Sequence, residues 1–183
     1  AVELGVPTLF LSNAGDPGWS ALAGPAEETG KLVVPAILWF HGLYRSPRAG
    51  FLLVVISAAT FGVVEGGLYA VSTSGFSPQR TFIEIIHVLL TGFIAAVAWR
   101  AAWKRPSLFT AAGIAAWAFA VAMHSFNDLS ISYADRVSGL GSATAVVLVV
   151  MYFAIKHAGR QLVPPDNVAA VSPRWRPRAP RAG

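Results

Sequence analysis

Four short patterns of ionisable residues lie within or beside long apolar stretches of the chain. They are Glu27-Glu28-Thr-Gly-Lys31, Phe61-Gly-Val-Val-Glu65, His87-Val-Leu-Leu-Thr91-Gly92 and His124-Ser-Phe-Asn-Asp128. An ionisable side chain at membrane depth costs several kcal/mol unless it is paired, hydrated or bound to a ligand. Carboxylates and imidazoles are also the groups that activate water or hold a metal ion. The patterns therefore predict a polar site in an apolar environment.

The glutamates of the first pattern are candidates for acid-base chemistry. Glu27 or Glu28 is the best candidate for a general base, because apolar surroundings make a carboxylate a stronger proton acceptor. Lys31, three and four residues further on, would keep the other glutamate ionised and fixed. Taken alone, the pattern favours an acidic helix start with an ion pair between residues i and i+4, and the other three patterns reverse this preference.

The histidines suggest a metal site. Glu65, His87 and His124 could supply one oxygen and two nitrogens, which is the ligand set of a catalytic zinc ion with an open position. In an alternative arrangement without metal, Glu27 and His124 share the water and His87 positions it. Taken singly, His87 could be a buried imidazole bonded to a neighbour on its helix, and His124 a partner of Asp128.

The composition indicates a membrane protein. Hydrophobic residues make up 55% of the 183 residues, and charged residues make up 13%, against about 25% in soluble domains. The mean hydropathy is +0.56. Only helices or closed barrels satisfy the backbone in lipid, so we expect an all-α polytopic membrane protein, a bundle of about five transmembrane helices. Because the chain begins at Ala1 rather than at methionine, it can be a fragment of a larger bundle.

Five apolar segments define the expected organisation. Residues 1–24 form an extracytoplasmic segment, residues 25–157 the transmembrane catalytic domain, and residues 158–183 a basic cytoplasmic tail rich in proline and arginine. Pro35 has no N–H to donate to the carbonyl of Lys31, so a kink is expected in the first helix. The predicted helices are 25–44, 50–71, 79–102, 107–129 and 137–155.

Basic residues are concentrated in alternate connections between these segments. One set of connections, with the tail, carries Arg45, Arg48, Arg100, Lys104, Arg105, Lys156, Arg160, Arg174, Arg176, Arg178 and Arg181. The other set carries only Arg80 and Arg136. By the positive-inside rule the first set is cytoplasmic, which places the N-terminus outside and the C-terminus in the cytoplasm of a multi-pass protein. The positive charge of the tail then follows from the orientation of the protein in the lipid bilayer, and nucleic acid is not an expected partner.

This orientation predicts the depth of the site. At about 1.5 Å per residue, Glu65 lies roughly 22 Å and His124 roughly 25 Å from the cytoplasmic ends of their helices. Arg80, Glu84, His87 and Thr91 form one polar stripe that begins near the outer end of the third helix. The polar residues of four helices therefore meet in the outer half of the membrane.

Taken in order, the four patterns resemble the motifs of the PrsW-type intramembrane proteases, which are related to the CAAX protease superfamily. In this family, EExxK, FxxxE and HxxxN/D motifs and a further histidine lie on successive membrane helices. The resemblance covers about residues 25–128. This chain has Glu65-Gly66 where family members often have Glu-Asn, and Asp128 where they often have Asn, so the group that would polarise a substrate carbonyl is here an acid.

The resemblance implies a bacterial cell-membrane endopeptidase that hydrolyses membrane-anchored proteins near the outer membrane face, with anti-sigma-factor-like proteins among its substrates. Its catalytic residues would be Glu27, Glu28, Glu65, His124 and Asp128, and its supporting residues Lys31, His87, Arg80 and Glu84. The alternatives are a proton-coupled transporter and a catalytically silent scaffold. A carrier should have polar residues that continue to the inner side, and the cytoplasmic halves of four of the helices are nearly free of them, which favours an enzyme.

Overall fold

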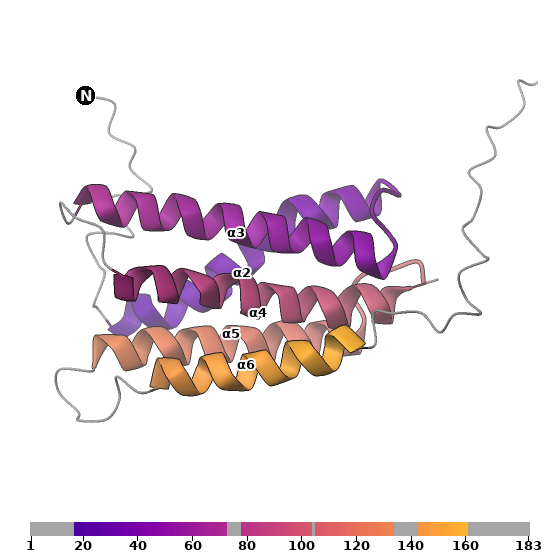
Figure 1. The fold of residues 1–183 in the computed structure, drawn as a ribbon. Helices are drawn as coiled ribbons and strands as arrows, with labels where there is room; N and C mark the ends of the chain where they lie inside the picture. The colour runs from indigo at the N-terminus through magenta and orange to yellow at the C-terminus, as the bar shows by residue number, and fades with distance from the viewer. Residues whose placement is uncertain (1–16, 73–77, 104, 134–142, 161–183) are drawn as a thin grey trace, which may run out of the picture.

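The computed structural model describes residues 17–72, 78–103, 105–133 and 143–160, and this part of the chain is α-helical without a β-strand (Figure 1). The helices run side by side and alternate in direction along the chain. Their bounds are α2 Pro17–Phe40, α3 Pro47–Ser72, α4 Pro78–Ala102, α5 Ala111–Ser132 and α6 Ala143–Arg160.

Helix α4 is the centre of the bundle and packs against α2, α3, α5 and α6. Helix α2 crosses behind α4 and contacts both α3 and α5. The largest core side chains are Trp39 and Trp99, which are almost fully buried. Helices α2, α4 and α5 are therefore in mutual contact, and α3 lies against α2 and α4.

The bundle buries a cluster of polar residues beside its apolar core and exposes many large apolar side chains, which is unlike a water-soluble protein. Glu28, Lys31, His87 and His124 are buried, whereas large aliphatic and aromatic side chains on α2, α3, α5 and α6 are exposed. Two stretches, Pro47–Val71 and Ile85–Ala102, are long and apolar enough to cross a membrane, and α6 has a shorter one, Ala145–Ala158. The predicted all-α membrane fold is confirmed. The number of spans and their orientation stay predictions.

Helix α2 differs most from its predicted range of 25–44. It begins at Pro17 and contains Pro25, so the interpretation of Glu27 and Glu28 as a first-turn acidic pair is wrong. It ends at Phe40 because Gly42 has a φ of 85° and closes the last turn. The N–H groups of Gly42 and Leu43 donate to the carbonyls of Trp39 and Leu38 at 2.9 Å, which is a Schellman motif.

The starts of α3 and α5 are set by hydroxyl caps. The N–H of Ala49 donates to Oγ of Ser46 at 3.3 Å, and the N–H of Gly113 donates to Oγ1 of Thr110 at 3.1 Å. Helix α5 therefore begins at Ala111, four residues after its predicted start. Helix α6 continues past its predicted end to Arg160, and residues 137–142 of its predicted range lie outside the described residues.

The close contact between α3 and α4 depends on a glycine. A Cβ at Gly50 would overlap the indole ring of Trp99, whose Nε1 donates to the carbonyl of Tyr44 at 3.0 Å. We expect Gly50→Ala to destabilise the fold by about 1–3 kcal/mol, because Trp99 cannot move without losing this bond. Gly67→Ala on the same helix meets no atom within 4 Å and should be neutral or slightly stabilising. Unfolding of both variants in detergent micelles tests this, and equal stabilities would contradict it.

Candidate active site

Glu28 lies where α2, α4 and α5 meet, and its side chain is fully buried. Its Oε1 accepts from Nζ of Lys31 at 2.8 Å and lies 2.9 Å from Nδ1 of His124. Its Oε2 accepts from the hydroxyl of Thr91 at 2.7 Å. Each carboxylate oxygen is thus hydrogen bonded, which is how a buried carboxylate is retained in an apolar environment. Glu28 is therefore placed to hold three helices together.

Glu27, the preceding residue, has different surroundings. Its side chain is 16% exposed, and its Oε2 is buried without a hydrogen-bond partner in the described part of the chain. This atom lies 3.5 Å from Nζ of Lys31, 3.6 Å from Nδ1 of His87 and 3.6 Å from Nε2 of His124. The oxygen of Glu27 therefore faces both histidines at a distance longer than a hydrogen bond.

Helix α4 contributes His87, which is held on both ring nitrogens. Its Nδ1 lies 2.6 Å from Nζ of Lys31, and its Nε2 lies 2.8 Å from Oε2 of Glu65 on α3. Since an ammonium group can only donate, Nδ1 accepts, and Nε2 carries the ring proton and is in close polar contact with Glu65. The ring of Phe61, from the same motif as Glu65, packs edge-on against the imidazole with centroids 5.5 Å apart.

Helix α5 contributes His124, whose ring centroid is 5.2 Å from that of His87. Its Nδ1 donates to Glu28, so its Nε2 is the nitrogen that faces Glu27. Asp128, one turn further along α5, places Oδ2 3.4 Å from the same Nε2. Each histidine is thus oriented by a carboxylate on one nitrogen and presents the other to Glu27.

These contacts bring together residues from four helices, as the sequence predicted. In the group that could hold a metal ion, one ligand atom each from Glu27, His87 and His124 lies within 4.8 Å of the others. The predicted ligand set had Glu65 in place of Glu27. In the structure, Glu65 instead contacts Nε2 of His87. Glu27 faces the other ring nitrogen, Nδ1.

The surroundings of this group suit a metal ion. Glu27 offers a buried oxygen without a hydrogen bond among the described residues, and a second carboxylate lies beside the other nitrogen of each imidazole, at 2.8 Å for His87 and 2.9 Å for His124. Metal-binding histidines commonly have such a carboxylate beside the second nitrogen. Within the described cluster four carboxylates, Glu27, Glu28, Glu65 and Asp128, accompany the one ammonium group of Lys31. The excess of negative charge favours a further cation.

The remaining predicted residues are placed as follows. Lys31 contacts Glu27, Glu28 and His87 and so belongs to the cluster. The side chains of Arg80 and Glu84 lie outside the described residues. Sequence reasoning placed Thr91 on the polar stripe with His87 but missed its bond to Glu28. It also missed Asn127, a buried residue whose Nδ2 donates to Oδ1 of Asp128 at 3.1 Å.

An all-α membrane bundle with a buried centre of carboxylates and imidazoles defines a candidate intramembrane hydrolase. A family model described as PrsW family intramembrane metalloprotease matches residues 10–155. The match covers most of the chain, and the chain belongs to this family of intramembrane proteases, as its motifs predicted. Among curated proteins and among solved structures, no match to the chain was found.

The contrast between the adjacent glutamates predicts different effects on stability. Glu28→Gln removes the charge that binds Lys31 and His124 inside the bundle, and should destabilise it by roughly 3 kcal/mol or more. Glu27→Gln alters an oxygen without a hydrogen bond and should change stability by less than about 1 kcal/mol. Unfolding by denaturant in mixed micelles compares the two variants. Equal losses of stability would show that Glu28 has no special structural role.

Proposed function

We propose that this protein hydrolyses a peptide bond of a membrane-anchored substrate at a centre held by Glu27, His87 and His124. The observation that carries this proposal is the convergence of these three side chains, from α2, α4 and α5, on one point. The supporting observation is that Glu28 and Glu65 orient the two imidazoles. Membership of an intramembrane metalloprotease family agrees with this assignment.

Zinc is the ion that we propose for this centre, because two imidazoles and one carboxylate form the ligand set of many catalytic zinc sites. Such an ion would supply Lewis acidity toward the scissile carbonyl and the attacking water. With the ion bound, Nδ1 of His87 would serve as a ligand in place of its contact with Lys31, and Lys31 would keep its bond to Glu28. The alternative without metal uses the same geometry, with Oε2 of Glu27 as the proton acceptor.

Asp128 is the residue that we assign to proton transfer. Its Oδ2 lies beside the nitrogen of His124 that faces Glu27, and its side chain is 24% exposed. Asn127 fixes the other carboxylate oxygen. A carboxylate in this position can take a proton from the attacking water and give it to the leaving amine, which hydrolysis of an amide requires. Glu65 touches the opposite nitrogen of His87 and is therefore assigned to orientation.

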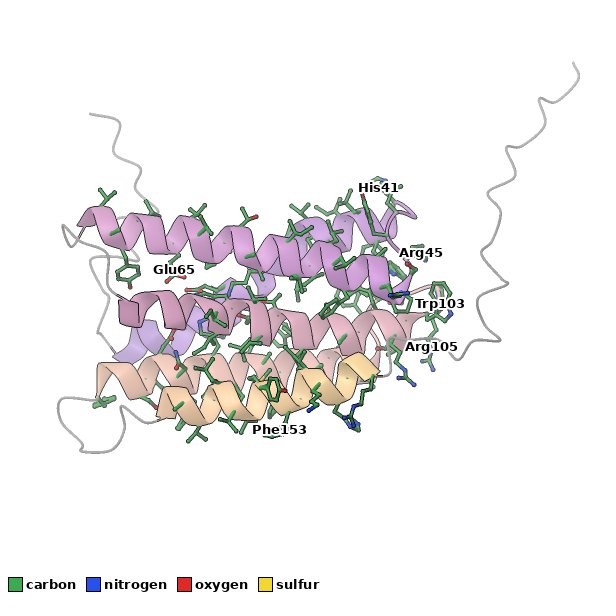
Figure 2. The ribbon with its side chains drawn as sticks, in the orientation of Figure 1. His41, Arg45, Glu65, Trp103, Arg105 and Phe153 are labelled. Carbon is green, nitrogen blue, oxygen red and sulfur yellow. The ribbon has the colours of Figure 1, made fainter. Side chains whose placement is uncertain are left out.

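The proposed substrates are proteins anchored in the membrane and cut near its outer face, with anti-sigma-factor-like proteins among them. The proposed depth is supported by the distribution of charge along the bundle. Figure 2 shows Glu65 toward one end of the bundle and His41, Arg45 and Arg105 at the other. If the basic end is cytoplasmic, the centre lies toward the outer face.

Catalysis can be tested with a substitution of Glu27 that preserves the fold, and with one of His124 that also removes a partner of Glu28 and therefore needs a check of folding. Glu27→Gln keeps the volume of the side chain and should lower cleavage of a membrane-anchored substrate by about 10²-fold or more, because the charged oxygen is lost. His124→Ala should act likewise. Under the zinc proposal both variants should also bind less metal, as measured by elemental analysis of the purified protein. His41→Ala, a histidine exposed at the basic end, is the matched control and should be silent.

Two results would contradict these assignments. Cleavage by both variants at the parent rate would remove Glu27 and His124 from the reaction. If the parent protein keeps full activity after a chelator has removed all bound metal, zinc has no part in the reaction and Glu27 is the base.

The orientation is tested separately by reporter fusions. A reporter fused after Gly183 should lie in the cytoplasm, and one inserted within residues 72–77 should lie outside the cell. The reason is that the connections with most Arg and Lys stay on the cytoplasmic side. The reverse result for both fusions would place the centre near the inner face.

A further inference from the structure

Helix α2 contains two prolines on either side of the segment that carries Glu27, Glu28 and Lys31. Proline has no N–H, so each removes the helical hydrogen bond to the carbonyl four residues earlier. Pro25 leaves the carbonyl of Ala21 without this partner, and Pro35 does the same for Lys31. In an apolar environment a carbonyl without a partner is costly, since no water replaces the bond.

Serine hydroxyls from two neighbouring helices fill both positions. Oγ of Ser125 on α5 donates to the carbonyl of Ala21 at 2.8 Å. Oγ of Ser57 on α3 donates to the carbonyl of Lys31, also at 2.8 Å. Both carbonyls that the prolines deprive of a helical N–H are therefore bonded to another helix.

The approach of α5 to this point depends on Gly24. A Cβ at Gly24 would lie 2.5 Å from Oγ of Ser125 and 2.8 Å from the carbonyl oxygen of Val121. Any larger residue would push α5 away and lengthen the bond to Ala21. Ser125 follows His124 directly, so this contact also sets the distance between His124 and the glutamates of α2.

We propose that Ser57 and Ser125 are positioning residues for the reaction. Their hydroxyls replace the two hydrogen bonds that Pro25 and Pro35 remove and tie α2 to α3 and α5, which fixes the position of the glutamate segment beside the histidines. The bonds lie one on each side of Glu27 and Glu28. The segment is thereby restrained against both sliding and rotation, which a proline-containing helix would otherwise permit. This inference rests on the proposed function, which assigns the reaction to Glu27, His87 and His124.

Serine-to-alanine variants test the positioning. Ser57→Ala and Ser125→Ala should each lower kcat about 10- to 100-fold, with a smaller effect on KM, because a displacement of about 1 Å has this effect on a catalytic geometry. Ser130→Ala is the matched control. Ser130 is also a buried serine of α5, but its hydroxyl donates to the carbonyl of Phe126 on its own helix at 2.7 Å, and its removal should leave kcat unchanged.

Matched proline replacements separate positioning from a general loss of stability. Pro35→Ala restores an N–H for the carbonyl of Lys31. The double variant Pro35→Ala/Ser57→Ala should therefore have a kcat within about threefold of that of the Pro35→Ala single variant. Pro25→Ala should do so for Ser125→Ala. The exchanged pairs, Pro25→Ala with Ser57→Ala and Pro35→Ala with Ser125→Ala, should show no rescue. Equal rescue by matched and exchanged prolines would overturn the proposal.

A readout without catalysis keeps this test distinct from that of the proposed function. The chain has no cysteine, so spin labels can be placed at the exposed positions Val33 and Ile56 for α2 and α3, and at Leu22 and Phe126 for α2 and α5. Ser57→Ala should broaden the first distance distribution and Ser125→Ala the second. If the parent cleaves no substrate, the proposed function fails and these distributions still decide the positioning. Unchanged distributions in both variants would overturn it.

Discussion

The carboxylate of Glu28 is the interaction on which the arrangement of the site depends. It is bonded to Lys31 of its own helix, to Thr91 of α4 and to His124 of α5. A carboxylate held inside an apolar bundle is stable only while these partners stay in place, and the partners are fixed by the same bonds. This one side chain therefore links three helices, and both of its oxygens are already occupied.

The division of labour between Glu27 and Glu28 follows from the geometry of a helix. Adjacent residues point about 100° apart, so two consecutive glutamates approach Lys31 and His124 from different sides. Glu28 points into the contact of α2 with α4 and α5, and Glu27 points toward the histidines and retains partial exposure. A structural carboxylate and a chemically available one are therefore placed side by side.

Much of the site could be predicted from sequence, because ionisable residues are conspicuous in apolar segments. The convergence of Glu27, Glu28, His87 and His124 needed only the helix order and the depth of each residue. The exchange of Glu65 for Glu27 in the metal-binding group could not be predicted, since it depends on how each helix is rotated about its axis. The early start of α2 was missed because Pro25 is compatible with a helix start, and only the contact with Ser125 explains why it lies inside.

The proline and serine pairs also limit how the length of α2 can vary. Ala21 and Lys31 are ten residues apart, which turns the helix through about 1000°, so their carbonyls point roughly 80° apart, one toward α5 and the other toward α3. Deletion or insertion of one residue between them would rotate one carbonyl by about 100° away from its hydroxyl. Homologues that keep this bracing are therefore expected to differ by substitution in this segment and to accept changes of length only outside it.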